Sequence, residues 1–341
     1  MANIRFQNAL SRTPQAVPPI WFMRQAGRYH KHYQSLRAQH TFIELCKMPD
    51  VAAEVAMGPI QDFDFDVAIL FSDLLFPLEA MGMGLAYEPA PKLGWSLTPE
   101  RLKDLRRVDE AVPHLEFQKL AMQKTRARLP DSKSLVGFVG GPWTLFTYAV
   151  EGAHKGGLES SKKLLSLFPK FCEIIVPILK RNIQLQLEGG AEVVMVFDTA
   201  AGELSPGVYR EAVIPSLNEL SRMFPKKLGY YAKNAQSYHL DHPFFRDREL
   251  LAGLGFDHRW EISGALKTQN VGFVQGNFDQ ALLFMAPQDF ENEVRRYLAP
   301  ILKLSIEQRA GWVSGLGHGV LPGTPEENVR SLVRIIREVM A

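Results

Sequence analysis

Short runs of apolar and β-branched residues recur along the chain, separated by longer segments with helical spacing. The runs occupy residues 17–23, 67–71, 135–139, 193–197, 228–232, 251–256, 271–275 and 311–314. Continuously apolar runs of this length are typical of strands buried on both faces, as in parallel sheets. Eight such strands alternating with helices, without a Gly/Ser/Pro-rich linker, predict one α/β domain over residues 1–341, folded as a (β/α)8 barrel.

The clearest helical pattern lies at the end of the chain. Thr324 precedes Pro325 and two glutamates, which predicts a capping hydroxyl followed by a proline at the first helical position. Apolar side chains then repeat at helical spacing, at Val329, Leu332, Val333, Ile336 and Met340.

A doubly wound dinucleotide-binding fold is the alternative α/β architecture. That fold carries a GxGxxG motif after an early strand, and this chain has none. The glycines of segment 137–141 are followed directly by Pro142. The barrel therefore fits the sequence better.

Composition restricts the class of protein further. The 341 residues are 46% hydrophobic and 22% charged, with a formal net charge of +2, which argues against a general nucleic-acid binder. Cys46 and Cys172 are too few for a disulfide framework or a Cys-rich zinc site. No apolar run approaches the ~20 residues of a membrane helix, and the first residues lack the apolar stretch of a signal peptide. We expect a cytoplasmic protein without a membrane or nucleic-acid partner.

Polar residues follow most of the predicted strands. In a barrel the carboxyl ends of the strands meet on one face, where active sites lie. The polar residues just beyond the runs include Arg24, Arg28, Asp73, Thr144, Tyr148, Asp198, Thr199, Lys233, Asn234, Asp257, His258, Asn277, Asp279 and His318. The sequence therefore predicts one site to which nearly every strand contributes.

Four of these positions suggest specific chemistry. Arg24 and Arg28 flank Gly27 and would hold carboxylates or phosphates in bidentate geometry, the alternative being a solvated basic loop. Asp73 would accept N–H donors or stabilise a cation at the mouth of a strand, unless it caps a helix. His318 lies between two glycines that let a ligand approach closely, although a lone histidine is more often structural.

Histidine pairs raise the question of a metal site. His30 and His32 form an H-x-H pattern, but they lie several residues beyond the first strand. His239 and His242 fall in a loop. Metal ligands in a barrel would lie on the strands themselves, so we expect no metal site and regard these histidines as surface residues.

Six blocks of the chain resemble uroporphyrinogen decarboxylase, in the same order. They are PIWFMRQAGRY (19–29), AILFSDLL (68–75), GFVGGPWTLFTYAVEG (137–152), VFDTAAGELSP (196–206), VQGNFD (274–279) and LGHGVLP (316–322). The combination of RQAGRY, FSDLL and LGHG is highly specific. The resemblance implies a single (β/α)8 barrel, in agreement with the independent strand count.

The resemblance also implies an activity and a site. The family removes the carboxyl groups of the four acetate side chains of uroporphyrinogen III, giving coproporphyrinogen III in haem biosynthesis. It uses no metal or organic cofactor and forms a homodimer. Carried over by motif, the substrate site comprises Arg24, Gln25, Ala26, Gly27, Arg28, Asp73, Tyr148, Thr199 and His318, with a peripheral contribution from Arg37.

The implied chemistry assigns roles to these residues. Protonation of a pyrrole carbon creates a cationic ring that accepts the electrons of the leaving carboxylate. Asp73 would hold the pyrrole N–H groups and stabilise that cation, while Arg24 and Arg28 clamp substrate carboxylates. Arg24 is also a candidate acid, although its high pKa makes it a poor one without local help.

The chain departs from the family pattern at a few positions. Gly315 stands where the family usually has Asn before LGHG, and Ala200 replaces a usual Trp. His30 and the residues after it replace the usual LPEY. These departures concern peripheral contacts, because the core groups are retained.

Two other functions remain open from the sequence. A zinc-dependent corrinoid methyltransferase of the same superfamily would need thiolate and imidazole ligands near the C-terminus, and no cysteine follows Cys172. A non-catalytic tetrapyrrole binder would gain nothing from Asp73, since an acid weakens the binding of an acidic ligand.

The charge distribution fits an acidic substrate. Residues 1–43 contain no Asp or Glu and carry a formal charge of +6, so the rest of the chain carries −4. An octacarboxylate needs local positive potential rather than a globally basic protein. This basic segment contains the proposed substrate clamp, Arg24 and Arg28.

Overall fold

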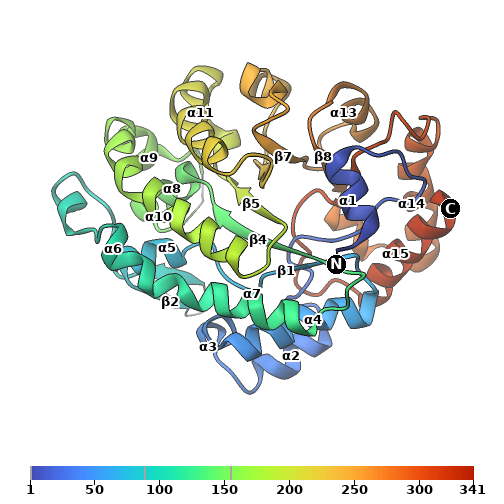
Figure 1. The fold of residues 1–341 in the computed structure, drawn as a ribbon, viewed down its shortest axis with the longest axis horizontal. Helices are drawn as coiled ribbons and strands as arrows, with labels where there is room; N and C mark the ends of the chain where they lie inside the picture. Colours follow the sequence, from blue (N-terminus) through green and yellow to red (C-terminus); the bar gives the residue numbers. More distant parts are fainter. Residues whose placement is uncertain (1, 88–89, 154–155) are drawn as a thin grey trace.

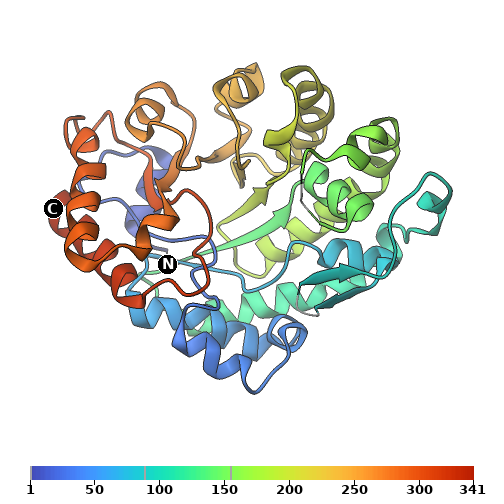
Figure 2. The same ribbon diagram turned by 180° about the vertical axis from the view of Figure 1, so that it is seen from behind.

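The computed structural model describes residues 2–87, 90–153 and 156–341, and its core is a parallel sheet. The strands of this sheet are β1 (Val67–Ile69), β4 (Ser134–Gly140), β5 (Val193–Phe197), β6 (Leu228–Tyr231), β7 (Leu251–Gly255), β8 (Phe273–Phe278) and β9 (Trp312–Leu316). Each strand pairs in parallel with the next along the chain. The helices surround the strands (Figures 1 and 2).

The first predicted strand closes the ring of strands with very few bonds. Ile20 forms a single parallel bridge with Ser314 of β9, and its carbonyl accepts the Asp66 N–H at 2.9 Å, just before β1. The prediction of a full strand over 17–23 was therefore too long. Pro18 and Pro19 have no N–H to donate to a ladder, so among the described residues this segment bonds β9 only through the Pro19 carbonyl, which accepts the Ser314 N–H at 2.9 Å, and through the Trp21 N–H, which donates to the Ser314 carbonyl at 3.3 Å.

Helices connect the strands. The α-helices are α1 (Ile4–Ser11), α2 (Lys31–Arg37), α3 (Phe42–Lys47), α4 (Pro49–Phe63), α5 (Phe76–Leu78), α6 (Val108–Ala111), α7 (Glu116–Arg128), α8 (Pro142–Glu151), α9 (Glu159–Lys163), α10 (Phe168–Glu188), α11 (Pro206–Met223), α12 (Ser237–Leu240), α13 (Ile262–Thr268), α14 (Pro287–Leu302) and α15 (Glu326–Met340). A π-turn, η1 (Glu79–Met83), and 3-10 turns, η2 (Glu100–Asp104), η3 (Val112–Leu115), η4 (Leu165–Leu167), η5 (Ala201–Glu203), η6 (Pro243–Arg246) and η7 (Gln280–Phe284), complete the helical elements. A small antiparallel pair, β2 (Leu85–Tyr87) and β3 (Pro91–Leu93), stands apart from the main sheet.

The strands are mainly apolar because both of their faces are buried. On β5, Val193, Met195 and Phe197 join the cluster inside the ring of strands, whereas Val194 and Val196 pack against the helices. Successive side chains of a strand point to opposite faces, so a strand between two apolar layers cannot carry a polar alternation. The predicted fold class is confirmed.

The last helix starts later than predicted. Pro325 has an extended backbone and occupies the capping position, so α15 begins at Glu326. The hydroxyl of Thr324 donates to the carbonyl of Leu321 at 2.8 Å and does not cap the helix. The apolar stripe of α15 is buried as expected.

The basic N-terminal segment is divided between the two ends of the barrel. Arg5 pairs with Asp66, and Arg12 donates to the carbonyl of Gly272 at 2.9 Å, both just before strands begin. Arg24 and Arg28 lie at the opposite end, after the first strand segment. Tertiary contacts therefore use part of the charge of this segment away from the Arg24 end.

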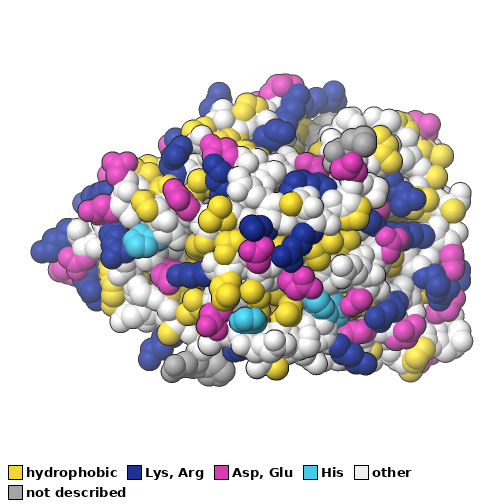
Figure 3. Space-filling model, turned by 60° about the horizontal axis from the view of Figure 1, so that its bottom comes forward, with side chains coloured by type: hydrophobic (Ala, Val, Ile, Leu, Met, Phe, Trp, Pro, Cys, Tyr) yellow, Lys and Arg dark blue, Asp and Glu magenta, His cyan; other side chains and the backbone are white. Residues whose placement is uncertain are grey.

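Surface charge is mixed on the face shown in Figure 3. Lys and Arg side chains lie among Asp and Glu side chains there, with hydrophobic side chains between them. Across the described ranges, no helix is both long and apolar enough to cross a membrane.

Candidate active site

The loop after the first strand segment is fixed from within. Arg24 has a left-handed backbone with φ of 57°, which turns the chain sharply after Met23. The Gln25 side chain is fully buried: its Nε2 donates to the Val67 carbonyl at 3.0 Å, and its Oε1 accepts the Phe22 N–H at 3.1 Å. These bonds anchor the loop to β1 and leave the Arg24 side chain exposed.

The rest of the RQAGRY segment continues this anchored turn. The Tyr29 hydroxyl donates to the Gln25 carbonyl at 2.7 Å, and the Gly27 carbonyl accepts the His30 N–H at 2.9 Å. Ala26 and Gly27 are half-buried, and Arg28 is exposed. The two arginines are therefore displayed by a rigid loop rather than by a mobile basic one.

Asp73 lies four residues beyond β1, close to Arg24 and Tyr148. Its Oδ1 accepts the Leu75 N–H at 2.8 Å, so it forms a local turn before α5. Burial raises the pKa of Asp73, while the Leu75 N–H, the Tyr87 hydroxyl and the Arg24 charge oppose that rise. The carboxylate therefore lies in a poorly solvated place with several groups that favour its charged form.

Tyr148 lies close enough to Asp73 for the Asp73 charge to change the pKa of the Tyr148 hydroxyl. Burial and the Asp73 charge raise the pKa of Tyr148, and the Arg24 charge lowers it. Tyr148 comes from α8, Asp73 from the loop after β1, and Arg24 from the loop after the first strand segment. Three of the residues predicted from sequence thus meet at one place.

His318 joins the same place through Tyr231, a residue that the sequence pattern does not single out. The rings of Tyr231 and His318 stack with centroids 6.1 Å apart, and the Tyr231 hydroxyl donates to the Gly317 carbonyl at 2.8 Å. Burial raises the pKa of Tyr231 above its usual value, and the nearby Arg24 charge opposes that rise. Tyr231 ends the apolar run of β6, so its sequence pattern resembled core.

The glycines around His318 allow close approaches. A Cβ on Gly319 would lie 2.5 Å from Cδ of Arg24, and a Cβ on Gly317 would lie 2.4 Å from the backbone N of His258. Real Cβ contacts do not come this close, so neither position accepts a side chain without displacement. Gly319 therefore makes room for the stem of Arg24.

Thr199 follows β5 in a loop that is tied to α8. The Asp198 Oδ1 accepts the Thr144 N–H at 2.9 Å and the Thr144 hydroxyl at 2.7 Å, and the Thr144 Oγ1 in turn accepts the Ala200 N–H at 2.9 Å. Burial raises the pKa of Asp198 to about 6. These bonds fix the loop that carries Thr199 against the start of the helix that carries Tyr148.

In the described part of the chain, two of the predicted site residues, Thr199 and Arg37, are not hydrogen-bonded to Arg24 or Asp73. Among the described residues, no hydrogen bond links Thr199 to Arg24 or Asp73, although Thr199 lies at the same end of the barrel. Arg37 is exposed on α2, where its Nη1 donates to the His40 carbonyl at 2.7 Å. Contact of the substrate with Thr199 and with Arg37 stays a prediction.

The structure also places the histidines set aside above. His30 and His239 are buried rather than at the surface. His30 Nε2 lies 2.6 Å from a carboxylate oxygen of Asp62, and His239 Nε2 lies 2.7 Å from the Leu204 carbonyl oxygen. Within the described ranges, no group of three or more His, Cys, Asp or Glu side chains has the arrangement of a metal site.

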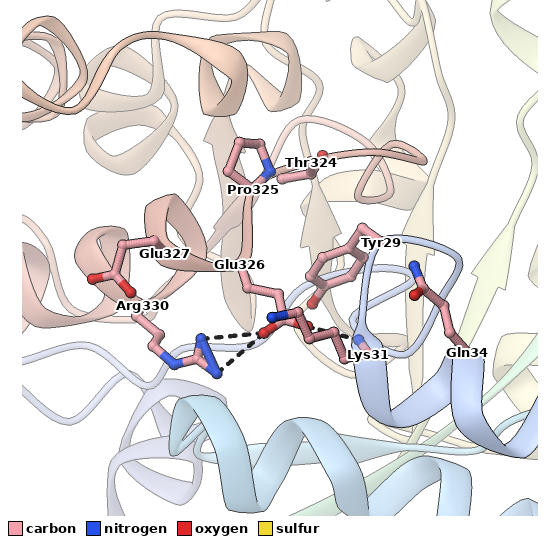
Figure 4. Close-up of a pocket in the computed structure, with 8 residues that line it drawn as sticks. All are labelled: Tyr29, Lys31, Gln34, Thr324, Pro325, Glu326, Glu327 and Arg330. Carbon is pink, nitrogen blue, oxygen red and sulfur yellow. Dashed lines mark hydrogen bonds and ion pairs between the residues drawn. The ribbon is translucent and has the colours of Figure 1, made fainter.

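A separate hollow lies beside the RQAGRY loop, between α2 and the start of α15 (Figure 4). It has a volume of about 400 Å³. The Glu326 carboxylate accepts the Lys31 N–H at 2.6 Å and pairs with Arg330 at 3.2 Å across it. Its lining contains neither Asp73 nor Arg24, so it is distinct from the predicted site.

The family comparison covers almost the entire chain. Residues 1–339 match the family model described as uroporphyrinogen decarboxylase (URO-D). The chain is 35% identical to the uroporphyrinogen decarboxylase of Solibacter usitatus, over 98% of this chain and 97% of the relative. It is also 35% identical to that of Thermus thermophilus, over 96% of each chain.

Solved structures share the fold. A methyltransferase from Methanosarcina mazei superposes with a TM-score of 0.73 at 18% identity, covering 99% of this chain and 98% of that chain. A putative vitamin-B12 independent methionine synthase from Listeria monocytogenes gives 0.56 at 12% identity, covering 96% and 98%. Identities this low support the fold alone, whereas the full-length family match goes further. The chain belongs to the uroporphyrinogen decarboxylase family.

Proposed function

We propose that this protein decarboxylates the four acetate side chains of uroporphyrinogen III, giving coproporphyrinogen III. One observation carries the proposal: Asp73 is a poorly solvated carboxylate that lies beside both Arg24 and Tyr148. An anionic group with cationic and phenolic neighbours fits a ligand that presents N–H groups at its centre and carboxylates at its edge. Family membership supports the same activity.

The chemistry follows from the electronic demand of the substrate. A pyrrole becomes an electron sink only after a ring carbon is protonated. The electrons of the acetate C–CO2 bond then flow into the cationic ring and CO2 leaves. A second proton completes the methyl group, and the ring carbon releases the first proton, so the pyrrole is restored and one proton is consumed for each carboxyl group lost. Asp73 would accept the pyrrole N–H groups and stabilise the cation, which requires its charged form.

The surrounding groups suit this role. Arg24 and the Leu75 N–H favour the charged form of Asp73 against the effect of burial. Arg24 and Arg28, exposed on the anchored loop, would bind substrate carboxylates and set the orientation of the ring. Tyr148 and His318 would complete the positioning of the substrate, with Thr199 at the margin.

The methyltransferase alternative fits less well. Zinc-activated thiol transfer relies on thiolate ligands. Burial raises the pKa of Cys46 far above its usual value and that of Cys172 to about 12, and the chain has no other cysteine. These two cysteines also lie on different helices, α3 and α10.

A product assay tests the proposal. Purified protein is incubated anaerobically with uroporphyrinogen III, with and without a chelator, and the oxidised products are separated by carboxylate number. We expect stepwise loss of four carboxylates in both samples. Products that keep all eight carboxylates would refute the decarboxylase, and loss of activity only with the chelator would favour a metal mechanism.

Asp73→Asn tests the assigned role of the carboxylate. The substitution keeps a hydrogen-bond acceptor for the Leu75 N–H but removes the charge. We expect kcat to fall by roughly 100-fold or more, since removing one electrostatic stabiliser of a transition state commonly costs that much. Turnover near the wild-type rate would rule out charge stabilisation by Asp73.

We also propose the homodimer and the undivided domain over residues 1–341 that the resemblance implies. Sedimentation equilibrium would give a mass twice that of the chain for the dimer. Limited proteolysis that releases a stably folded half would contradict a single domain.

A further inference from the structure

A tyrosine on the small β2–β3 hairpin reaches back to Asp73. Tyr87 ends β2 and pairs with Pro91 of β3. Its ring packs on Phe42 of α3 with centroids 4.5 Å apart, and Phe42 in turn lies 5.9 Å from Phe71, two residues before Asp73. The hairpin is thus joined to the Asp73 loop by a row of aromatic rings.

The Tyr87 hydroxyl is buried beside the Asp73 carboxylate. The hydroxyl has no hydrogen-bond partner among the described residues, and the Asp73 Oδ1 is already occupied by the Leu75 N–H. Burial and the Asp73 charge raise the pKa of Tyr87 far above its usual value. The phenol therefore stays protonated and has only a proton to offer to the carboxylate.

We propose that Tyr87 is a positioning residue for the decarboxylation, which orients Asp73 and stabilises its charged form by donating a hydrogen bond from its hydroxyl to the carboxylate. This inference rests on the proposed function. A buried carboxylate is favoured by each hydrogen bond made to its charged form. The hairpin supplies such a bond from outside the ring of strands.

Other groups also act on this pair. Arg24 and Tyr148 lie beside Asp73, and the Cys46 thiol of α3 lies close to both Asp73 and Tyr87. Glu79 of η1 adds negative charge near Tyr87, but it pairs with Lys47 at 2.7 Å. Among these neighbours, Arg24 favours the charged carboxylate, so Tyr87 adds to its effect.

Tyr87→Phe removes only the hydroxyl and keeps the ring on Phe42. In Tyr87→Phe, we expect the acid side of the pH profile of kcat/KM to move to higher pH. The rate should be about tenfold below wild type on the acid side and less reduced at high pH. Tyr209→Phe is the matched control, since it removes a buried hydroxyl that bonds Tyr230 at 3.0 Å, away from Asp73. A purely structural role would lower the rate uniformly and leave the limb in place.

A second readout separates this inference from the proposed function. The Asp73 carboxyl carbon is followed by 13C NMR in protein labelled at aspartate, and its signal is identified by its loss in Asp73→Asn. Tyr87→Phe should raise the titration midpoint of that signal and Tyr209→Phe should not. Unchanged midpoints overturn the inference even if wild type decarboxylates uroporphyrinogen, and a raised midpoint upholds the contact even if it does not.

Discussion

Gly319 offers a sharp test of the site, because the three atoms nearest to a Cβ at this position all belong to Arg24. The new methyl would lie 2.5 Å from Cδ and 2.7 Å from Cγ of Arg24. The loop cannot easily retreat, since the next residue, Val320, donates its N–H to the Met23 carbonyl at 3.0 Å. The exposed Arg24 side chain must therefore move instead of the backbone.

The size of the effect follows from that displacement. An ordinary contact begins at 3.4 Å, so the stem of Arg24 must shift by about 1 Å. A misplacement of about 1 Å in a substrate-orienting group can reduce catalysis about 100-fold, which corresponds to about 2.7 kcal/mol in transition-state free energy. Stability should change little, because Arg24 is exposed and Gly→Ala restricts the unfolded chain.

The assay compares kcat/KM for uroporphyrinogen III and the thermal midpoint of unfolding in wild type and two variants. Gly207→Ala on α11 is the matched control, because a methyl there meets nothing within 4 Å. We expect a loss of about 100-fold in Gly319→Ala and none in Gly207→Ala, with similar midpoints. Gly319→Ala enzyme that stays within about threefold of wild type would refute the placement of Arg24 as a substrate clamp.

Two further predictions address the charge of individual side chains. Burial raises the folded-state pKa of Asp198 from 3.8 to about 6. The contribution of Asp198 to the free energy of unfolding is therefore fully present below about pH 4. It is lost as pH rises through 6, and the free energy of unfolding falls by about 3 kcal/mol. Asp198→Asn should flatten this part of the pH dependence in urea unfolding, and parallel curves for the two proteins would contradict the assignment. Arg28→Gln should raise KM for uroporphyrinogen III about tenfold by removing a charged hydrogen-bond donor, whereas Arg37→Gln should change it less than twofold. Equal effects of these two substitutions in steady-state kinetics would mean that Arg28 is no closer to substrate than Arg37.

Most of the barrel was predictable because strand pattern and strand burial have the same cause. Val193–Phe197 is apolar at every position since it contacts apolar layers on both sides, and the predicted run coincides with β5. The first segment was overpredicted because apolarity does not reveal that two prolines cannot donate to a ladder. The predicted start of α15 was one residue too early, because a proline fits both the capping position and the first helical position.

The candidate site was predictable where side chains sit just beyond strand ends. Arg24, Asp73 and Tyr148 follow three separate strand segments, and the parallel topology alone brings such positions to one face. Tyr231 and Tyr87 were missed for opposite reasons. Tyr231 lies within an apolar run, and Tyr87 lies on a hairpin outside the strand–helix alternation.

The sequence by itself determined the architecture, the loops that carry the chemistry and the family, because these depend on local periodicity and on contiguous motifs. Only the tertiary structure decided which charges meet. It assigned Arg5 and Arg12 to one end of the barrel and Arg24 to the other, and it placed Tyr87 beside Asp73 across an aromatic row. Burial and the distance between charges arise from segments remote in the chain, so the protonation of Asp73 and Asp198 was fixed only when those segments packed together.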